Sequence, residues 1–160
     1  MLTHIDAHGR AQMVDISAKN DTERVARAKA NVVMLKETRA LISQGAIEKG
    51  DVFAVARVAG IMAAKRTHEL IPMCHQLLLT DVEIQFQDSP PPDDAHAQIE
   101  ITGIAKNVGK TGVEMEALVA VSNAALTIYD MVKAVDRRVR IDNIRLVYKA
   151  GGKSGEIHLE

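Results

Sequence analysis

The chain has 160 residues, a formal net charge of −1 and 47% hydrophobic residues, which is enough apolar material for one domain with its own core. Aromatic residues make up only 2% and Trp is absent, so Ala, Val, Ile, Leu and Met must build the core. Few aromatics and a near-neutral charge argue against a base-stacking surface for nucleic acid and against electrostatic binding to nucleic acid or membranes.

The single cysteine, Cys74, leaves no internal disulfide framework and no Cys-rich zinc site, and it suits a reducing compartment. No apolar run reaches the ~20 residues that a bilayer-spanning helix needs. The first residues also lack a long apolar signal segment. We therefore expect a cytoplasmic protein without a membrane span, organised as a single domain over residues 1–160.

Hydrophobic periodicity and turn residues predict the first elements along the chain. Residues 23–34 alternate small apolar with polar side chains and favour a strand. Residues 36–45 predict a short helix that ends at its final glycine. Residues 51–72 predict one longer helix, with Asp51 as its N-cap and the final proline beyond its end. Gly60 inside this helix indicates close packing against a neighbour.

The second half of the chain contains a predicted hairpin, a long helix and a last strand. Apolar residues alternate with polar ones over 82–87 and again over 98–101, which favours two antiparallel strands. The proline-rich stretch 88–96 between them is the expected variable hairpin tip. A helix over 112–135 and a strand over 140–150 complete an α+β domain, an antiparallel sheet with helices packed on one face.

The helix over 112–135 carries a narrow polar stripe in an otherwise apolar sequence. Its four members, within roughly 60° of one another on a helix, are Glu116, Asn123, Thr127 and Asp130. The stripe is either a buried ion-pair network with an exposed edge or the lining of a ligand site, because isolated buried charges are too costly. The helix rise places the two ends of the stripe, Glu116 and Asp130, about 21 Å apart. One small pocket could hardly use both residues. An elongated ligand could, and so could a site shared between neighbouring chains.

Small residues on the same helix suit close helix packing, including packing across a subunit interface. They are Ala117, Ala120, Ala124 and Ala125.

Two stretches resemble phosphate loops. Residues 103–112 resemble a Walker A motif, but Ile104 stands where the motif needs its first glycine. The weaker expectation is that a Gly-rich turn with Lys110, opening a helix, suits an anion. In residues 149–155, flexible glycines with Lys149 and Lys153 can wrap phosphate oxygens. The alternative there is a frayed, solvated tail.

Cys74 and His75 lie side by side in an apolar run and allow three interpretations. A nucleophilic pair would need the two side chains to face each other, which adjacent residues seldom do. A metal site lacks any recognised ligand spacing. We favour a ligand-lining His75 with Cys74 as core packing, against the alternative of a satisfied structural histidine. Lys49 and Lys65 are further basic candidates, although cations near a helix end, such as Lys65, are favoured anyway.

Four stretches, spread over nearly the whole chain, carry a family resemblance: "MVDISAK", "KGDVFAVARVAGIMAAKRTHELIPMCHQLLLTDVEI", "GKTGVEMEALVAVSNAALTIYDMVKAVDR" and "GGKSG". Together they resemble the cyclic pyranopterin monophosphate synthase family of molybdenum-cofactor biosynthesis, the MoaC family.

The resemblance implies a fold, an assembly and a reaction. The fold is a ferredoxin-like α+β subunit, and the assembly is a homohexamer, a trimer of dimers with the site at a dimer interface. The reaction converts 3′,8-cyclo-7,8-dihydroguanosine 5′-triphosphate, a cyclised dihydro-GTP, to cyclic pyranopterin monophosphate with loss of pyrophosphate. This lyase-type chemistry opens and closes rings, so it calls for paired acids and bases. We expect no resident metal or cofactor, although the triphosphate can bring Mg²⁺ with it.

The resemblance also implies site residues. We assign proton transfer to Asp130, Lys133 and Lys49, with Asp130 polarising the lysines or relaying protons. The expected substrate-binding residues are Met73, Cys74, His75, Glu114, Met115 and Glu116, with Lys65, Lys149 and Lys153 as candidates for the triphosphate charge. The two glutamates suit guanine N–H donors. The other functions considered are a non-enzymatic nucleotide- or anion-binding module and a P-loop NTPase that depends on Lys110.

Overall fold

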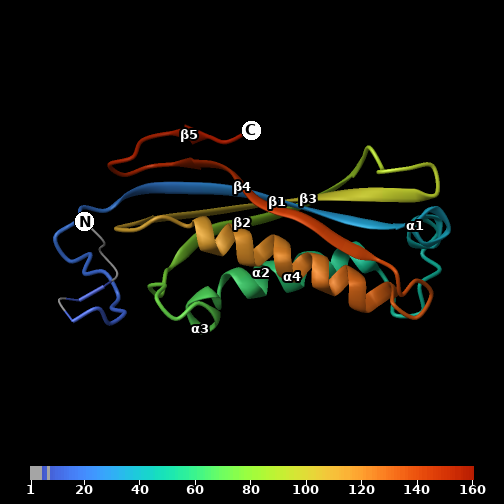
Figure 1. Ribbon diagram of the computed structural model, residues 1–160, viewed down its shortest axis with the longest axis horizontal. Helices are drawn as coiled ribbons and strands as arrows, with labels where there is room; N and C mark the ends of the chain where they lie inside the picture. Colours follow the sequence, from blue (N-terminus) through green and yellow to red (C-terminus); the bar gives the residue numbers. More distant parts are fainter. Residues whose placement is uncertain (1–4, 7) are drawn as a thin grey trace.

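Five antiparallel strands form one open sheet in this computed structural model, which describes residues 5–6 and 8–160 (Figure 1). The strand order is β2-β3-β1-β4-β5. The strands are β1 (Thr22–Leu35), β2 (Leu79–Ser89), β3 (His96–Gly109), β4 (Arg140–Ala150) and β5 (Ile157–His158).

Strand β1 lies in the middle of the sheet, paired with β3 on one side and β4 on the other. Along this strand, buried apolar side chains alternate with polar ones, as expected from the sequence. Ala26, Ala28 and Ala30 are fully buried on one face, while Arg27 and Lys29 lie on the other face. The prediction of a strand over residues 23–34 is confirmed.

Strands β2 and β3 form the predicted antiparallel hairpin, with Phe86 opposite Ile101. The proline-rich segment, residues 90–95, connects the two strands, and the Asp93 carboxylate accepts hydrogen bonds from the backbone N–H groups of Ala95 and His96. The tip is therefore held by its own side chain.

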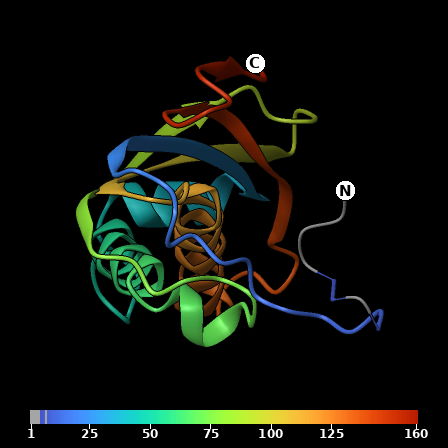
Figure 2. The ribbon, with the colours of Figure 1, turned by 90° about the vertical axis from the view of Figure 1, so that its left-hand side faces the viewer.

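In the described part of the chain, four helices accompany the sheet: α1 (Lys36–Ser43), α2 (Val52–Ala64), α3 (Thr67–Leu70) and α4 (Glu114–Val132). Helices α2 and α4 lie side by side against one face of the sheet, as the two views show (Figures 1 and 2). The predicted α+β architecture, with helices packed on one face, is confirmed.

Helices α2 and α4 approach closely because small residues meet between them. A Cβ added to Gly60 would lie 2.9 Å from the Ala120 carbonyl oxygen, so the predicted close packing at Gly60 is confirmed. The alanines proposed for a subunit interface are all fully buried inside the chain, which corrects that proposal: they are Ala117, Ala120, Ala124 and Ala125.

Helix α2 begins as predicted, because the Asp51 side chain accepts a hydrogen bond of 3.0 Å from the Ala54 N–H. It ends early, however. The Thr67 hydroxyl donates to the Ala64 carbonyl at 3.0 Å, which satisfies a helix-terminal acceptor and lets the chain turn into α3. The prediction of one continuous helix over 51–72 is therefore wrong.

The C-terminal residues return to the sheet. Strand β5 pairs with the end of β4, with His158 opposite Tyr148. Residues 149–155 are therefore a strand end and a turn inside a hairpin, and the frayed tail considered from the sequence is absent.

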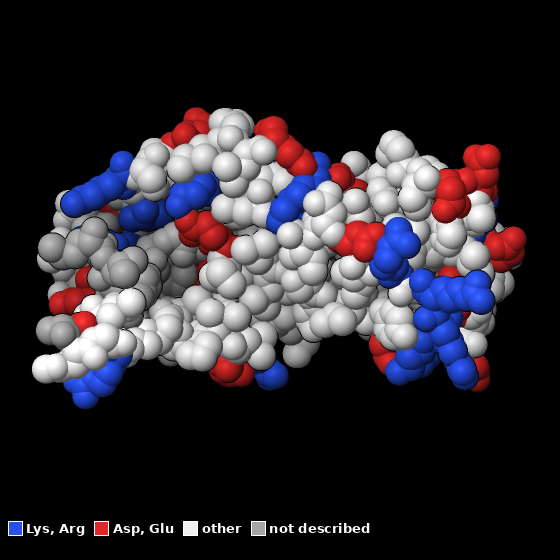
Figure 3. Space-filling model, in the orientation of Figure 1, with Lys and Arg blue, Asp and Glu red and all other residues white. Residues whose placement is uncertain are grey.

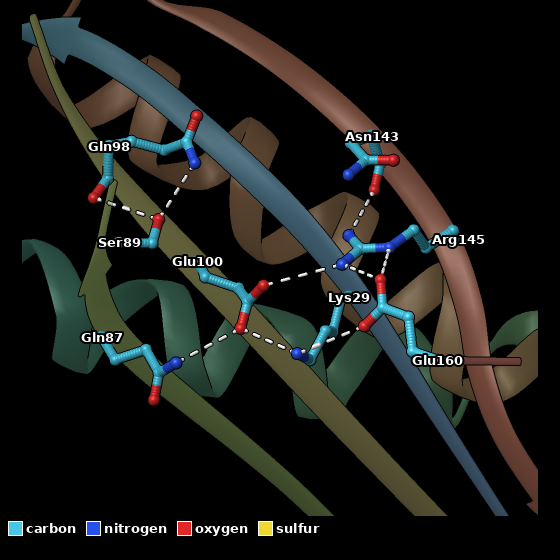
Figure 4. Close-up of polar contacts among 8 residues, drawn as sticks. All are labelled: Lys29, Gln87, Ser89, Gln98, Glu100, Asn143, Arg145 and Glu160. Atoms are coloured by element: carbon cyan, nitrogen blue, oxygen red, sulfur yellow. Dashed lines mark hydrogen bonds and ion pairs between the residues drawn. The ribbon is translucent and has the colours of Figure 1, made fainter. Parts of the chain in front are cut away.

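The sheet face opposite α2 and α4 carries a charged network instead of helices (Figure 4). Lys29 lies 3.0 Å from Glu100 and 3.5 Å from Glu160, and Arg145 also contacts both carboxylates. Opposite charges on adjacent strands keep this partly covered polar face neutral.

Helix α4 is long and apolar enough to cross a bilayer by length and composition, but 56% of its apolar window is buried inside the protein. Burial against α2 and the sheet accounts for its composition, which is that of a core helix.

Candidate active site

A cavity of about 480 Å³ opens where α4 begins. The helix contributes its first turn, and the segment after α3 contributes the opposite side. Of the residues predicted to touch substrate, those that line this cavity are Met73, Cys74, His75, Glu114, Met115 and Glu116. Val14 and Ile16, from the N-terminal segment, line it as well.

Glu116 is the most deeply buried carboxyl group in this cavity, with 4% of its surface exposed. Burial raises its pKa, and together with the negative charge of the neighbouring Glu114 it brings the pKa to about 7. A carboxyl with this pKa exchanges a proton near neutral pH, which is the range that acid–base catalysis requires.

His75 and Cys74 do not form a nucleophilic pair. His75 Nε2 lies 2.8 Å from the Val14 carbonyl oxygen, and because that oxygen can only accept, Nε2 carries the proton. Burial raises the pKa of the Cys74 thiol, and the nearby Glu116 raises it further, so the thiol stays neutral. In the part of the chain that the structure describes, no three His, Cys, Asp or Glu side chains cluster closely enough to hold a metal ion.

A second cavity, of about 600 Å³, adjoins the first and shares Lys19 and Glu114 with it. Its lining is strongly basic. Lys and Arg side chains gather at this end of the molecule, where the N-terminal segment, the start of α4 and the β4–β5 turn meet (Figure 3). The basic residues of this cavity are Lys19, Arg24, Lys110, Lys149 and Lys153.

Backbone carbonyls and one acid hold these cations in place. Arg24 Nε donates to the Gly109 carbonyl oxygen at 3.2 Å, and Lys110 Nζ donates to the Ser17 carbonyl oxygen at 2.8 Å. Lys149 forms an ion pair with Glu114. Five cations face one carboxylate across the cavity, an excess of positive charge that suits a polyanion.

Asp130, Lys49 and Lys133 form a separate cluster at the other end of α4, which we call the ion triad. Asp130 Oδ2 lies 2.7 Å from Lys49 Nζ, and Asp130 Oδ1 lies 2.6 Å from Lys133 Nζ. The two lysines, Lys133 first, lower the Asp130 pKa to about 2, and Asp130 in turn raises the pKa of Lys133. All three side chains are about half exposed.

The middle of the predicted polar stripe has a structural role. Asn123 Nδ2 donates to the Ala59 carbonyl oxygen of α2 at 3.0 Å, and the Thr127 hydroxyl donates to the Asn123 carbonyl oxygen at 2.7 Å. The two ends of the stripe, Glu116 and Asp130, therefore belong to different clusters.

Comparison with known proteins identifies the family. Residues 13–152 match the model of the MoaC family. A protein of Desulforamulus reducens named cyclic pyranopterin monophosphate synthase is 59% identical over 99% of this chain and 94% of its own length. A protein of the same name from Methylobacterium nodulans is 59% identical over 96% of this chain and 94% of its own length. The chain belongs to the MoaC family.

As a MoaC family chain, the protein has its predicted site residues in two places. At the start of α4, the first cavity contains the predicted substrate-binding residues from the segment after α3 and from the first turn of α4, and the adjoining basic cavity contains Lys149 and Lys153. The ion triad lies at the far end of the same helix. Lys65, the C-cap residue of α2, lines neither of the two cavities.

Two residues of the basic cavity, Lys19 and Arg24, were not predicted from the sequence, and Lys110 was considered only for an anion-binding turn or a P-loop NTPase. The sequence contained a clue to Arg24. In the predicted strand it lies on the same face as the buried Ala26, and a cation on a core-facing position needs a partner. Residues 103–109 of the Walker-like stretch 103–112 lie within β3, so this stretch forms no phosphate loop of the Walker type.

Proposed function

We propose that this chain is a cyclic pyranopterin monophosphate synthase that converts the cyclised dihydro-GTP to cyclic pyranopterin monophosphate and pyrophosphate. The observation that carries the proposal is 59% identity, over nearly the whole chain, to two relatives of that name. Two adjoining cavities support it: the one with carboxyl groups suits a guanine-derived ring, and the basic one suits a triphosphate.

The substrate lies across the two cavities in this proposal. Glu114 and the ionised form of Glu116 accept hydrogen bonds from N–H groups of the base. Met73, Met115 and Cys74 pack on the ring, and His75 forms a further hydrogen bond with the substrate. Lys149 and Lys153 bind triphosphate oxygens, and the newly found Lys19 and Arg24 join them. Any Mg²⁺ arrives with the triphosphate.

The ion triad carries out proton transfer in this proposal. Asp130 stays ionised at working pH and holds Lys133 protonated, which makes Lys133 a proton donor as the rings open and close. Lys49 is the second acid–base candidate. A sugar hydroxyl then attacks the α-phosphorus and expels pyrophosphate, with the cations of the basic cavity stabilising the charge that develops.

A site that needs both clusters requires two chains. The cavities and the ion triad lie at opposite ends of the 19-residue helix α4, too far apart for one small ligand to contact both within one chain. A twofold arrangement with antiparallel α4 helices would bring each ion triad beside the partner's cavity, and Lys65 could then contribute from the partner. The apolar outer surface of α2, with Val55, Val58 and Met62 exposed, suits such an interface.

We further propose that these dimers form a homohexamer, as a trimer of dimers.

We also propose a cytoplasmic location, which the single unpaired cysteine supports.

The proposal is tested by incubating the purified protein with the cyclised dihydro-GTP and measuring pyrophosphate and the cyclic pterin product together. Wild type should form both in equal amounts, while Asp130→Asn and Lys133→Ala should remain folded and lose turnover. A folded wild-type protein that binds the substrate and forms neither product would contradict the assignment and favour a binding module.

A further inference from the structure

The turn between β4 and β5 packs its backbone directly against Arg24. A Cβ added to Gly152 would lie 1.7 Å from Arg24 Nη1, and one added to Gly151 would lie 2.1 Å from the Glu23 carbonyl oxygen. Both glycines have positive φ, +104° at Gly151 and +72° at Gly152. No side chain fits at either position without a displacement.

Arg24 is held from two sides and keeps most of its hydrogen-bonding capacity. Its Nε donates to the Gly109 carbonyl oxygen at 3.2 Å, and the Gly152 backbone covers Nη1 on the other side. Among residues 5–6 and 8–160, the remaining guanidinium N–H groups find no acceptor. Arg24 lines the same basic cavity as Lys149 and Lys153, so its guanidinium adds hydrogen-bond donors to the cationic lining of that cavity.

We propose that Gly152 is a positioning residue for substrate: its lack of a side chain fixes the Arg24 guanidinium in the basic cavity, ready to bind phosphate oxygens. This inference rests on the proposed function, because it takes the triphosphate to be the ligand of that cavity.

The two glycines act differently because different atoms oppose them. A Cβ added at Gly151 would meet the Glu23 carbonyl oxygen of β1, which cannot move without disturbing the sheet. A Cβ added at Gly152 would meet the end of the flexible Arg24 side chain, which can move away. An alanine at Gly152 therefore displaces Arg24 and leaves the hairpin in place, at the cost of some backbone strain from the positive φ.

Inorganic tripolyphosphate, titrated calorimetrically, is the probe for this effect. Gly152→Ala should weaken its binding about as much as Arg24→Ala does, by roughly tenfold or more, since each removes a charge-assisted contact. Gly155→Ala is the matched control: its φ is +66°, but no atom lies within 4 Å of the added Cβ. It imposes similar strain and should bind the probe as wild type does.

A double-mutant cycle separates positioning from general damage. Once Arg24→Ala has removed the guanidinium, adding Gly152→Ala should weaken binding no further, because there is nothing left to displace. Additive losses, or wild-type affinity in a folded Gly152→Ala, would overturn the inference. The two proposals fail separately, since absence of turnover by wild type would refute the synthase, whereas this cycle concerns only anion binding.

Discussion

At the scale of single residues, two acids on one helix have opposite protonation behaviour because their surroundings differ. Glu116 is buried beside Glu114, which raises its pKa to about 7. Asp130 is exposed between Lys133 and Lys49, which lower its pKa to about 2. The first cavity therefore holds a carboxyl group that exchanges its proton near neutral pH, whereas the ion triad holds a permanent anion.

Glu116 should make folding stability depend on pH. Its pKa is raised from 4.5 to about 7 on folding, so the folded chain binds the proton more tightly than the unfolded chain. Stability should therefore fall as pH rises from about 4.5 to about 7, by up to about 3 kcal/mol from this group. Urea unfolding of wild type and Glu116→Gln between pH 4.5 and 8.5 measures the difference.

The uncharged Gln should lack this contribution, so the variant should gain stability relative to wild type as pH rises. A constant difference across this range would show that Glu116 does not titrate there.

At the scale of elements, the close pairing of α2 and α4 gives the site its support. Small residues at the contact, such as Gly60 and Ala120, let the helices approach, and Asn123 fastens α4 to the Ala59 carbonyl of α2. The first turn of α4 is thereby fixed against the sheet, which places Glu114 and Glu116 at the cavity. Accurate placement of catalytic groups depends on rigid elements of this kind.

The N-cap of α2 should contribute measurably to stability. Asp51→Ala removes the acceptor for the Ala54 N–H and should lower the free energy of unfolding by about 1 kcal/mol. Asp51→Asn keeps a capping oxygen and serves as the control, with a much smaller expected loss. Equal losses for both variants in urea unfolding would mean that the carboxylate charge, and not the cap, is what matters.

At the scale of the whole molecule, the cavities and the ion triad lie at opposite ends of helix α4, whose course Figure 1 shows. Charged side chains gather at both ends, while the surface over α2 and α4 between them is mostly uncharged. This distribution fits a chain whose neutral middle meets a second copy and whose two ends complete each other's site, as proposed above.

A shared site predicts complementation between two inactive variants. Lys149→Ala damages the cavity and Asp130→Asn damages the triad, so a mixed dimer has one intact site of its two. Equal amounts refolded together should regain roughly a quarter of wild-type activity, since half of randomly formed dimers are mixed.

The control mixture pairs Asp130→Asn with Lys133→Ala. Both changes damage the triad, so every site in a mixed dimer remains defective and no activity should return. If the mixture of Lys149→Ala with Asp130→Asn also stays inactive although mixed dimers form, the basic cavity and the ion triad do not form one site across two chains.

Local sequence was sufficient for most of the regular elements. Alternation predicted β1 and the β2–β3 hairpin, and Asp51 predicted where α2 begins, because side-chain periodicity and capping act over only a few residues. The same signals missed the break after Ala64. That break depends on the hydroxyl of Thr67, whose role is visible only once the chain has turned.

The sequence by itself determined the fold class, the family and six of the residues that line the first cavity, because these follow from periodicity and from long matching stretches. Only the tertiary structure decided which of them meet. Arg24, Lys110 and Lys149 are far apart in the chain, and strand pairing brings them to one cavity. The same helix that places Glu116 in the adjoining first cavity carries Asp130 away from both cavities, because each helical residue adds about 1.5 Å.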